Sequence, residues 1–275
     1  MFIQGSNFGH QASFKCGHVN GRHNSGDHIH QFLELELITE GEIEITVNGR
    51  VHIARAGDIA VIPPFKVHSF NTPERVKMLI ATMPGLFIPP QISRDELYCE
   101  RESFVFHASE ALWGYLEGTD FDSTQTKWPI DLIKDRELIL KLQATVHLIL
   151  AEFLTVTRAT DKSRTSDTLA RILLYISEHF AEDITISSIA EALGYSSKYV
   201  SNCFAALPGI SFRDFLNQLR IEEAKHKLSS GEDTVLSIAI ECGFKNESSF
   251  HRIFREITGM TPAKYRAEKK LHPSK

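Results

Sequence analysis

Residues 238–266 read IAIECGFKNESSFHRIFREITGMTPAKYR, and this stretch decides how the C-terminal part of the chain folds. The pattern predicts a helix, a glycine turn, a second helix and a stop. Gly243 follows the last apolar residue of the first helix, where a left-handed backbone favours a residue without a Cβ. Asn246 can cap the second helix, and Gly259 and Pro262 can end it.

The second helix of this stretch has one apolar face and one polar face. Its apolar side chains recur every three or four residues, at Phe250, Ile253, Phe254 and Ile257. The opposite face carries groups that can reach base edges and phosphates, namely Glu247, Ser248, His251, Arg252 and Arg255. A polar helix after a tight turn is typical of a helix-turn-helix that enters the DNA major groove, expected here over residues 234–258.

An earlier segment, residues 184–204, repeats this pattern 49 residues upstream. Ile189-Ala190 and Gly194-Tyr195 match Ile238-Ala239 and Gly243-Phe244. In this first helix-turn-helix the candidate reading residues are Lys198, Ser201 and Asn202. The periodic segment that follows, from Phe212, predicts a helix between the two motifs. About 17 residues of helix span roughly 26 Å, so the two reading helices would lie about one DNA turn apart.

Residues 1–85 alternate apolar and polar side chains with the period of β-strands. Leu33, Leu35 and Leu37 alternate with glutamates, and Asn48-Gly49 between two such runs is a strong hairpin signal. Short strands separated by turns predict an antiparallel β-barrel or jelly roll. We expect residues 86–128 to add short helices that close the barrel.

Residues 130–157 change to the period of a long helix. Their apolar side chains fall near one face, at Ile133, Leu138, Leu142, Val146, Ile149 and Phe153. This helix could pack on its own barrel or form an interface between two copies of the chain. The polar residues 158–166 predict a linker. The fold class is therefore α+β with two domains, 1–157 and an all-α domain over 167–268, with 269–275 as a tail.

The charge of the chain is unevenly distributed. Residues 1–157 hold 13 Lys+Arg against 20 Asp+Glu, whereas residues 158–275 hold 17 against 15. The C-terminal excess has the sign expected of a DNA-binding domain, and its small size predicts modest non-specific affinity. Four scattered cysteines without a C-x-x-C pair argue against a disulfide framework and suit the cytoplasm. We expect neither a membrane span nor a signal peptide.

A histidine cluster is expected in the barrel. His28 and His30 lie two apart, so on a strand they point the same way, and Glu34 would share their face. His68 on a neighbouring strand could complete a ligand set for zinc, iron or manganese. Without a metal, the same four side chains could hydrogen-bond a small effector such as a sugar, with Phe70 stacking on its ring.

Residues 167–268 resemble the DNA-binding domain of AraC/XylS transcriptional regulators. The match includes Ile189-Ala190, Leu219-Arg220, Ile238-Ala239, Gly243-Phe244 and Thr261-Pro262. The spacing from His28 to His68 resembles the two motifs of the cupin family, a fold that such regulators commonly use as an N-terminal effector domain. The resemblance implies a cytoplasmic homodimer without a cofactor that binds double-stranded DNA, responds to a small effector such as a sugar and activates transcription through RNA polymerase.

The chain departs from these families in two places. Relatives often have arginine where Asn202 stands and lysine after the phenylalanine, whereas here Ala205 follows Phe204 and Pro208 comes soon after. The first helix-turn-helix could therefore read bases with few contacts to the DNA phosphate backbone, or it could be mainly structural. Phe65 replaces a glycine of the second cupin motif. Two alternatives stay open: a metal-dependent cupin enzyme fused to a DNA-binding module, and a barrel that only oligomerises.

Overall fold

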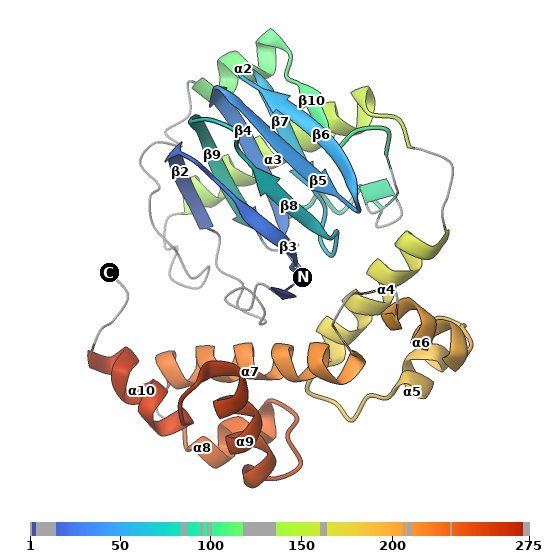
Figure 1. The fold of residues 1–275 in the computed structure, drawn as a ribbon, viewed down its shortest axis with the longest axis vertical. Helices are drawn as coiled ribbons and strands as arrows, with labels where there is room; N and C mark the ends of the chain where they lie inside the picture. Colours follow the sequence, from blue (N-terminus) through green and yellow to red (C-terminus); the bar gives the residue numbers. More distant parts are fainter. Residues whose placement is uncertain are drawn as a thin grey trace. The chain divides into compact units, whose positions relative to one another are not determined.

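The computed structural model describes residues 2–3, 15–83, 87–93, 96–97, 99, 101–117, 136–159, 164–205, 207, 211–231 and 233–271. The chain divides into two compact units, and the division falls between Ala170 and Arg171 (Figure 1). The first unit contains the strands from Lys15 onward and the helices before Arg164, helix α4 (Arg164–His179) crosses the division, and the second unit contains the helices after it. Each unit is described by itself.

The strands form two five-stranded sheets, of order β1-β3-β8-β5-β6 and β10-β7-β4-β9-β2. Their bounds are β1 Phe2–Ile3, β2 Lys15–Gly21, β3 Ser25–Ile29, β4 Leu33–Glu40, β5 Glu42–Val47, β6 Arg50–Arg55, β7 Asp58–Ile62, β8 His68–Asn71, β9 Val76–Met83 and β10 Val105–His107. The pairings of β4 with β7 and β9, and of β5 with β6 and β8, are antiparallel. The predicted antiparallel barrel is confirmed as a two-layer cupin-like β-sandwich.

The hairpin between β5 and β6 follows from two residues. Asn48 and Gly49 both have positive φ angles, 49° and 78°, and Val47 pairs with Arg50 across the turn. Two left-handed residues in a two-residue loop match the right-handed twist of the flanking strands. The Asn-Gly signal therefore sets the register of the two strands that it joins.

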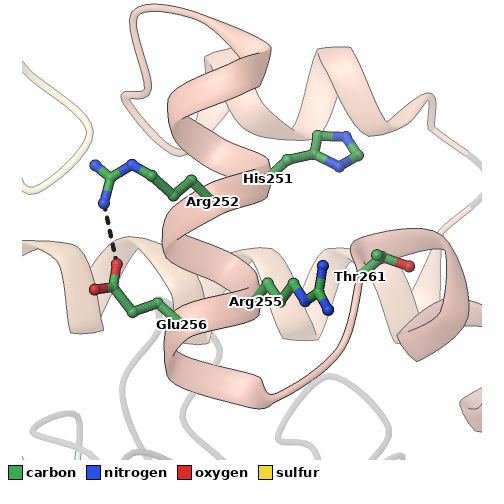
Figure 2. A pocket seen from close by; sticks show the side chains of 5 residues that line it. All are labelled: His251, Arg252, Arg255, Glu256 and Thr261. Atoms are coloured by element: carbon green, nitrogen blue, oxygen red, sulfur yellow. Dashed lines mark hydrogen bonds and ion pairs between the residues drawn. The ribbon is translucent and has the colours of Figure 1, made fainter.

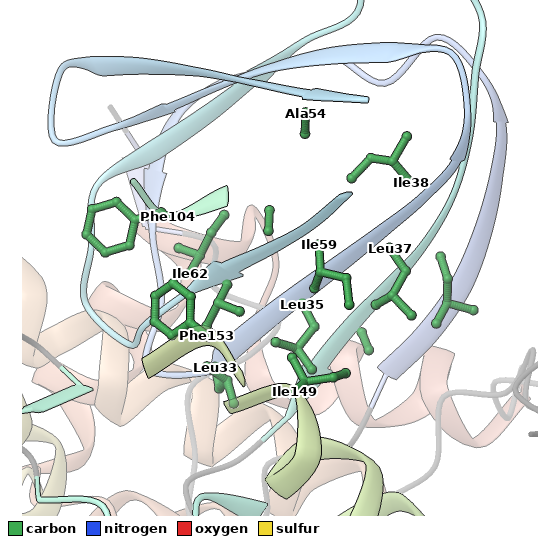
Figure 3. Close-up of a cluster of buried hydrophobic side chains, with 14 of the residues drawn as sticks. Leu33, Leu35, Leu37, Ile38, Ala54, Ile59, Ile62, Phe104, Ile149 and Phe153 are labelled. Carbon is green, nitrogen blue, oxygen red and sulfur yellow. The ribbon is translucent and has the colours of Figure 1, made fainter. Parts of the chain in front are cut away.

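Helix α3, Arg136–Val156, covers one face of the second sheet. Figure 3 shows Ile149 and Phe153 of this helix beside Leu33 and Leu35 of β4. Leu142, Val146 and Leu150 of α3 are also buried in this core. The segment Ile139–Val156 is long and apolar enough to cross a membrane by length and composition. Because its buried face belongs to the core of the sandwich, we interpret it as a core helix.

The connection that follows the sandwich differs from the prediction of short helices. Helix α2, Glu110–Glu117, is present, but Val105–His107 forms strand β10, which pairs with β7. A strand forms here because β7 would otherwise leave an edge unpaired on that side. Residues 118–135, which include Ile133, lie outside the described residues.

The second unit is helical throughout its described residues. Its helices are α4 Arg164–His179, α5 Ile186–Leu193, α6 Ser197–Ala205, α7 Phe212–Ser230, α8 Val235–Glu241, α9 Glu247–Thr258 and α10 Pro262–Leu271. Both predicted helix-turn-helix motifs form, as the pairs α5–α6 and α8–α9. Helix α4 begins at Arg164, inside the segment that the sequence predicts as a linker, and residues 160–163 of that segment lie outside the described residues.

Candidate nucleic-acid interface and histidine cluster

Helix α9 is held by a short set of local interactions. The Asn246 side chain accepts a hydrogen bond from the backbone of Ser249 at 2.8 Å and so caps the helix. Gly243 supplies the left-handed backbone of the preceding turn, with φ at 83°. Phe250 and Phe254 are fully buried on the inner face. The outer face is consequently fixed in direction relative to the core.

The predicted reading residues of α9 lie on its outer face. Glu247, Ser248, Arg252 and Arg255 are exposed, and His251 is half-buried. An open groove of about 530 Å³ lies against this face. Figure 2 shows the side chains that line it. Its lining residues are His251, Arg252, Arg255, Glu256 and Thr261. Four of them come from α9, so the groove runs along the helix.

Arg252 and His251 of α9 have carboxylate partners one helical turn away. Arg252 Nη1 lies 3.1 Å from Glu256 Oε2, and His251 Nε2 lies 3.4 Å from Glu247 Oε1. Exposed pairs of this kind contribute about 0.3–0.5 kcal/mol. A DNA phosphate or base edge can therefore replace either carboxylate at little cost.

Helix α6 offers a less charged face. Ser196 caps it by accepting from the backbone of Tyr199, and Val200, Cys203 and Phe204 are buried. The predicted residues Lys198, Ser201 and Asn202 are exposed. Lys198 is the one cation within Ser197–Ala205. The helix ends at Ala205, while Pro208 lies outside the described residues.

The histidine cluster forms inside the sandwich, from three places in the chain. Ligand atoms of His28, His30, Glu34 and His68 all lie within 4.8 Å of one another, and all four residues are buried. His28 is on β3 and pairs directly with His68 on β8. The four predicted side chains come together, but not from one strand, because β3 ends at Ile29, before His30, and Glu34 lies on β4. The packing of one sheet against the other, not the local spacing, brings the carboxylate in.

Hydrogen bonds orient two of the rings. His28 Nδ1 donates to the carbonyl of Gly26 at 2.9 Å, and His68 Nδ1 donates to the carbonyl of Lys66 at 2.8 Å. A carbonyl accepts only, so each ring carries its proton on Nδ1. His68 Nε2 lies 3.0 Å from Glu34 Oε2. At this distance the two atoms can share a hydrogen bond or bind one metal ion.

The four residues also have the orientation and the ligand atoms that a divalent metal site requires. Carbonyl partners on Nδ1 are the usual second layer of a histidine metal site, because they make Nε2 the coordinating atom. Three histidine nitrogens and a carboxylate oxygen suit zinc, iron or manganese. His30 Nε2 donates to Glu34 at 2.7 Å, and its buried Nδ1 has no hydrogen-bond partner among the described residues.

Burial and the neighbouring charges together set the pKa values of the cluster. Desolvation, and then the charge of His68, lower the pKa of His28 to about 4. Burial alone would raise the pKa of Glu34, but the hydrogen bonds and charges of His30 and His68 outweigh it and hold that pKa well below its usual range. Glu34 is therefore an anion at neutral pH.

Two further polar residues of the barrel interior were missed by the sequence reasoning. Glu36 is 0% exposed, and neither of its carboxyl oxygens has a hydrogen-bond partner within the described part of the chain. Burial, and then the charge of Glu34, raise its pKa well above the usual value. Thr82, opposite Glu34 on β9, also has a buried oxygen without a partner. The alternation of Leu33 to Leu37 gave a signal for a strand but none for a buried glutamate.

Two phenylalanines flank the cluster. The ring of Phe70 lies 5.8 Å from that of His28 and 5.4 Å from that of His68, so it forms an apolar wall of the site. Phe65, at the position where the cupin motif has glycine, has a left-handed backbone with φ at 62°. Its backbone N–H donates to the carbonyl of His30 at 2.8 Å. The turn thus keeps the geometry that glycine would favour and ties itself to the cluster.

Two family models match the chain. Residues 189–268 match a helix-turn-helix domain, and residues 18–82 match a cupin domain. The C-terminal domain of AraT, a response regulator from Geobacillus stearothermophilus, is 34% identical, with 38% of this chain and 88% of that chain covered and a TM-score of 0.36.

Curated relatives are transcriptional regulators and not enzymes. An HTH-type transcriptional regulator from Staphylococcus aureus is 34% identical over 140 residues, and the match spans 50% of this chain but 18% of that longer protein. The transcriptional activator NphR from a Rhodococcus species is 28% identical over 244 residues, 84% of this chain and 69% of NphR. The chain belongs to the AraC-type helix-turn-helix regulators and carries an N-terminal cupin domain.

Proposed function

We propose that this chain is a sequence-specific, DNA-binding transcriptional activator controlled by a small molecule that binds inside the cupin domain. The DNA-binding part of this proposal rests on helix α9, in which the buried Phe250 and Phe254 fix the direction of the outer face that carries the reading residues. A rigid helix with such a face is what major-groove recognition requires. Activation is favoured by the similarity to NphR, which is named an activator.

The two reading helices have unequal roles. In α9, Arg252 and Arg255 can donate to guanine or phosphate, and Glu247, Ser248 and His251 can contact further base edges. In α6, Ser201 and Asn202 can read bases, whereas Lys198 supplies the cation for phosphate. We expect α9 to contribute most of the specific affinity.

The effector site is the interior of the sandwich around His28, His30, Glu34, His68 and Phe70. Unpartnered buried oxygens cost free energy unless a ligand satisfies them, and Glu36 and Thr82 hold three such atoms. A ligand with several hydroxyl groups could both donate to and accept from these side chains. We therefore propose a polyol or sugar as the effector class, with Glu36 and Thr82 added to the predicted residues.

The assembly is proposed to be a homodimer that acts in the cytoplasm with RNA polymerase. Helix α3 buries one face and exposes Leu140, Ala144 and Leu148 on the other. Side chains four residues apart form a continuous stripe, so this outer face can pack against the same helix of a second copy. Helix α3 would then both pack on its own sandwich and form the interface between two copies of the chain.

A binding selection tests the proposal. Full-length protein would be used to select duplexes from a random DNA library, and the selected duplex would be bound in a gel-shift titration with and without a panel of sugars and polyols. Specific binding that at least one compound changes is expected. A chain that selects no sequence would contradict the DNA-binding proposal, and a selected duplex whose affinity and transcription no compound alters would contradict effector control.

The effector residues have their own test. His68→Ala and Glu36→Gln should abolish the response to the active compound but leave binding of the selected duplex within about twofold, because neither lies in the DNA-binding unit. His107→Ala, an exposed histidine of the same domain, serves as the matched control. A response that survives both cluster substitutions would place the effector elsewhere.

A further inference from the structure

The two helix-turn-helix motifs meet at a half-buried arginine. Arg220 on α7 donates from Nε to the carbonyl of Phe180 and from Nη2 to the carbonyl of Glu182, both at 2.8 Å. These carbonyls belong to the loop that leads into α5. The same guanidinium lies over the ring of Phe244, with Cζ 5.7 Å from the ring centroid. One side chain thus connects the entrance of the first motif to the turn of the second.

Two neighbouring contacts join the same segments. A Cβ on Gly243 would lie 2.5 Å from the carbonyl oxygen of Ala181, so the two backbones approach as closely as glycine permits. Lys245 Nζ lies 2.8 Å from Asp183 Oδ2 in an exposed ion pair. We call the set formed by Arg220, loop 180–183 and turn 243–245 the Arg220 bridge.

The bridge depends on the shape of arginine. The planar guanidinium can send two donors to two separate carbonyls while its flat face contacts an aromatic ring, which a lysine ammonium cannot do. Helix α7 connects α6 to α8 along the chain. The bridge adds a second connection, because it ties the turn of the second motif directly to the loop that leads into the first.

We propose that Arg220 is a positioning residue that holds the α6 and α9 reading helices in one fixed relation, so that both bind DNA as a single rigid surface. The inference rests on the proposed DNA-binding function. Two linked binding modules gain affinity from their high effective concentration, and this gain is largest when the linkage already matches the distance between the sites. Because Nε and Nη2 are occupied by carbonyls, the contribution of Arg220 acts through geometry.

The test compares DNA duplexes that engage one motif or both. The duplex selected by wild-type protein would be prepared intact, with one half scrambled, and with five base pairs inserted between the halves. Arg220→Lys keeps the positive charge but removes the planar guanidinium that donates to both carbonyls. We expect it to bind the intact duplex at least about tenfold more weakly, to bind the half-scrambled duplex within about twofold of wild type, and to show a smaller penalty for the insertion.

The controls separate positioning from folding. Arg213→Lys changes an exposed arginine on the same helix and should match wild type on all three duplexes. Thermal melting by circular dichroism checks that each variant is folded. If Arg220→Lys is unfolded, Phe244→Leu removes the aromatic platform more mildly and should give the same pattern with smaller losses.

The binding of the three duplexes tests the positioning role of Arg220 directly. Equal losses on the intact and half-scrambled duplexes, or an unchanged insertion penalty in folded variants, would overturn the positioning role while leaving DNA binding in place. A wild-type protein that selects no duplex would contradict the proposed function and, with it, this inference.

Discussion

Glu34 and Glu36 lie two residues apart on β4 and both are buried, yet within the described part of the chain only Glu34 has hydrogen-bond partners. Oε2 of Glu34 accepts from His30 at 2.7 Å and lies 3.0 Å from His68 Nε2. Neither oxygen of Glu36 has a partner among the residues described. The two carboxyl groups consequently have pKa values displaced in opposite directions.

Glu36→Gln should stabilise the protein, and the gain should grow with pH. The pKa of Glu36 is raised in the folded state above its usual value of 4.5, so above that pH the unfolded chain releases this proton first and wild-type stability falls as pH rises. Glutamine has no proton to release. The difference should increase by up to about 1.4 kcal/mol per pH unit until the folded pKa is reached. Urea unfolding across this range measures it.

The control for this prediction is Glu74→Gln, which alters an exposed glutamate of the same domain. Its difference from wild type should not vary with pH over the same range. A stability difference for Glu36→Gln that stays constant as pH rises would show that the buried carboxyl does not hold its proton as inferred.

The DNA-reading half of the molecule could be predicted from sequence because its determinants are local. Gly243, Asn246 and the spacing of Phe250 and Phe254 fix the turn, the cap and the buried face within a dozen residues. The residues that would face DNA follow from that face by helical geometry. No long-range contact is needed to place them.

The barrel interior could be predicted only in part, because it depends on pairing between distant strands. His28 meets His68 through the β3–β8 register, and Glu34 arrives from a different sheet. Leucines and glutamates alternating on β4 indicate a strand, but not that a second sheet covers the glutamate face. Glu36 and Thr82 were missed for that reason. The Arg220 bridge likewise joins residues 40 and 38 positions apart.

Divalent metal should stabilise the protein through the histidine cluster. Zinc, manganese or ferrous ion added to metal-stripped protein at about 100 times its Kd would raise the unfolding free energy by about 2.7 kcal/mol. The gain should disappear in His68→Ala, which removes the ring that faces Glu34. Thermal melting with each ion, together with metal analysis of untagged protein, provides the measurement.

His107→Ala is the matched control, since this exposed histidine pairs with Asp58 outside the cluster and should leave the metal response intact. If none of the three ions changes the melting of wild-type protein, the cluster does not bind these metals and is a binding site for the effector alone.

Substitutions on the outer face of α3 should separate the proposed dimer. Leu140 is 56% exposed and Leu148 46% exposed, so Leu140→Glu with Leu148→Glu adds charge without removing core packing. Carboxylates brought together across a helix interface repel and lose hydration. Light scattering after size-exclusion chromatography should show a dimer for wild type and a monomer for the double variant. Wild-type protein that is monomeric at micromolar concentration would refute this interface.

Arg252→Ala should weaken binding of the selected duplex more than Asn202→Ala. Arg252 lies on the reading helix that carries two arginines and can exchange its exposed partner Glu256 for DNA at little cost. Loss of an arginine contact to a base costs about 1–3 kcal/mol. Asn202 lies on α6, where Lys198 is the one cation of the helix, so fewer phosphate contacts hold it against the bases.

The kind of contact can be read from the same titrations. If Arg252 binds a base, Arg252→Ala should relax sequence preference at one position of the selected duplex, whereas loss of a phosphate contact should lower the salt dependence by about one ion. Glu256→Gln, which frees Arg252 and removes a negative charge from the groove, should strengthen binding modestly. Equal losses for Arg252→Ala and Asn202→Ala would mean that both motifs read DNA with similar weight, and a larger loss for Asn202→Ala would reverse the assigned order.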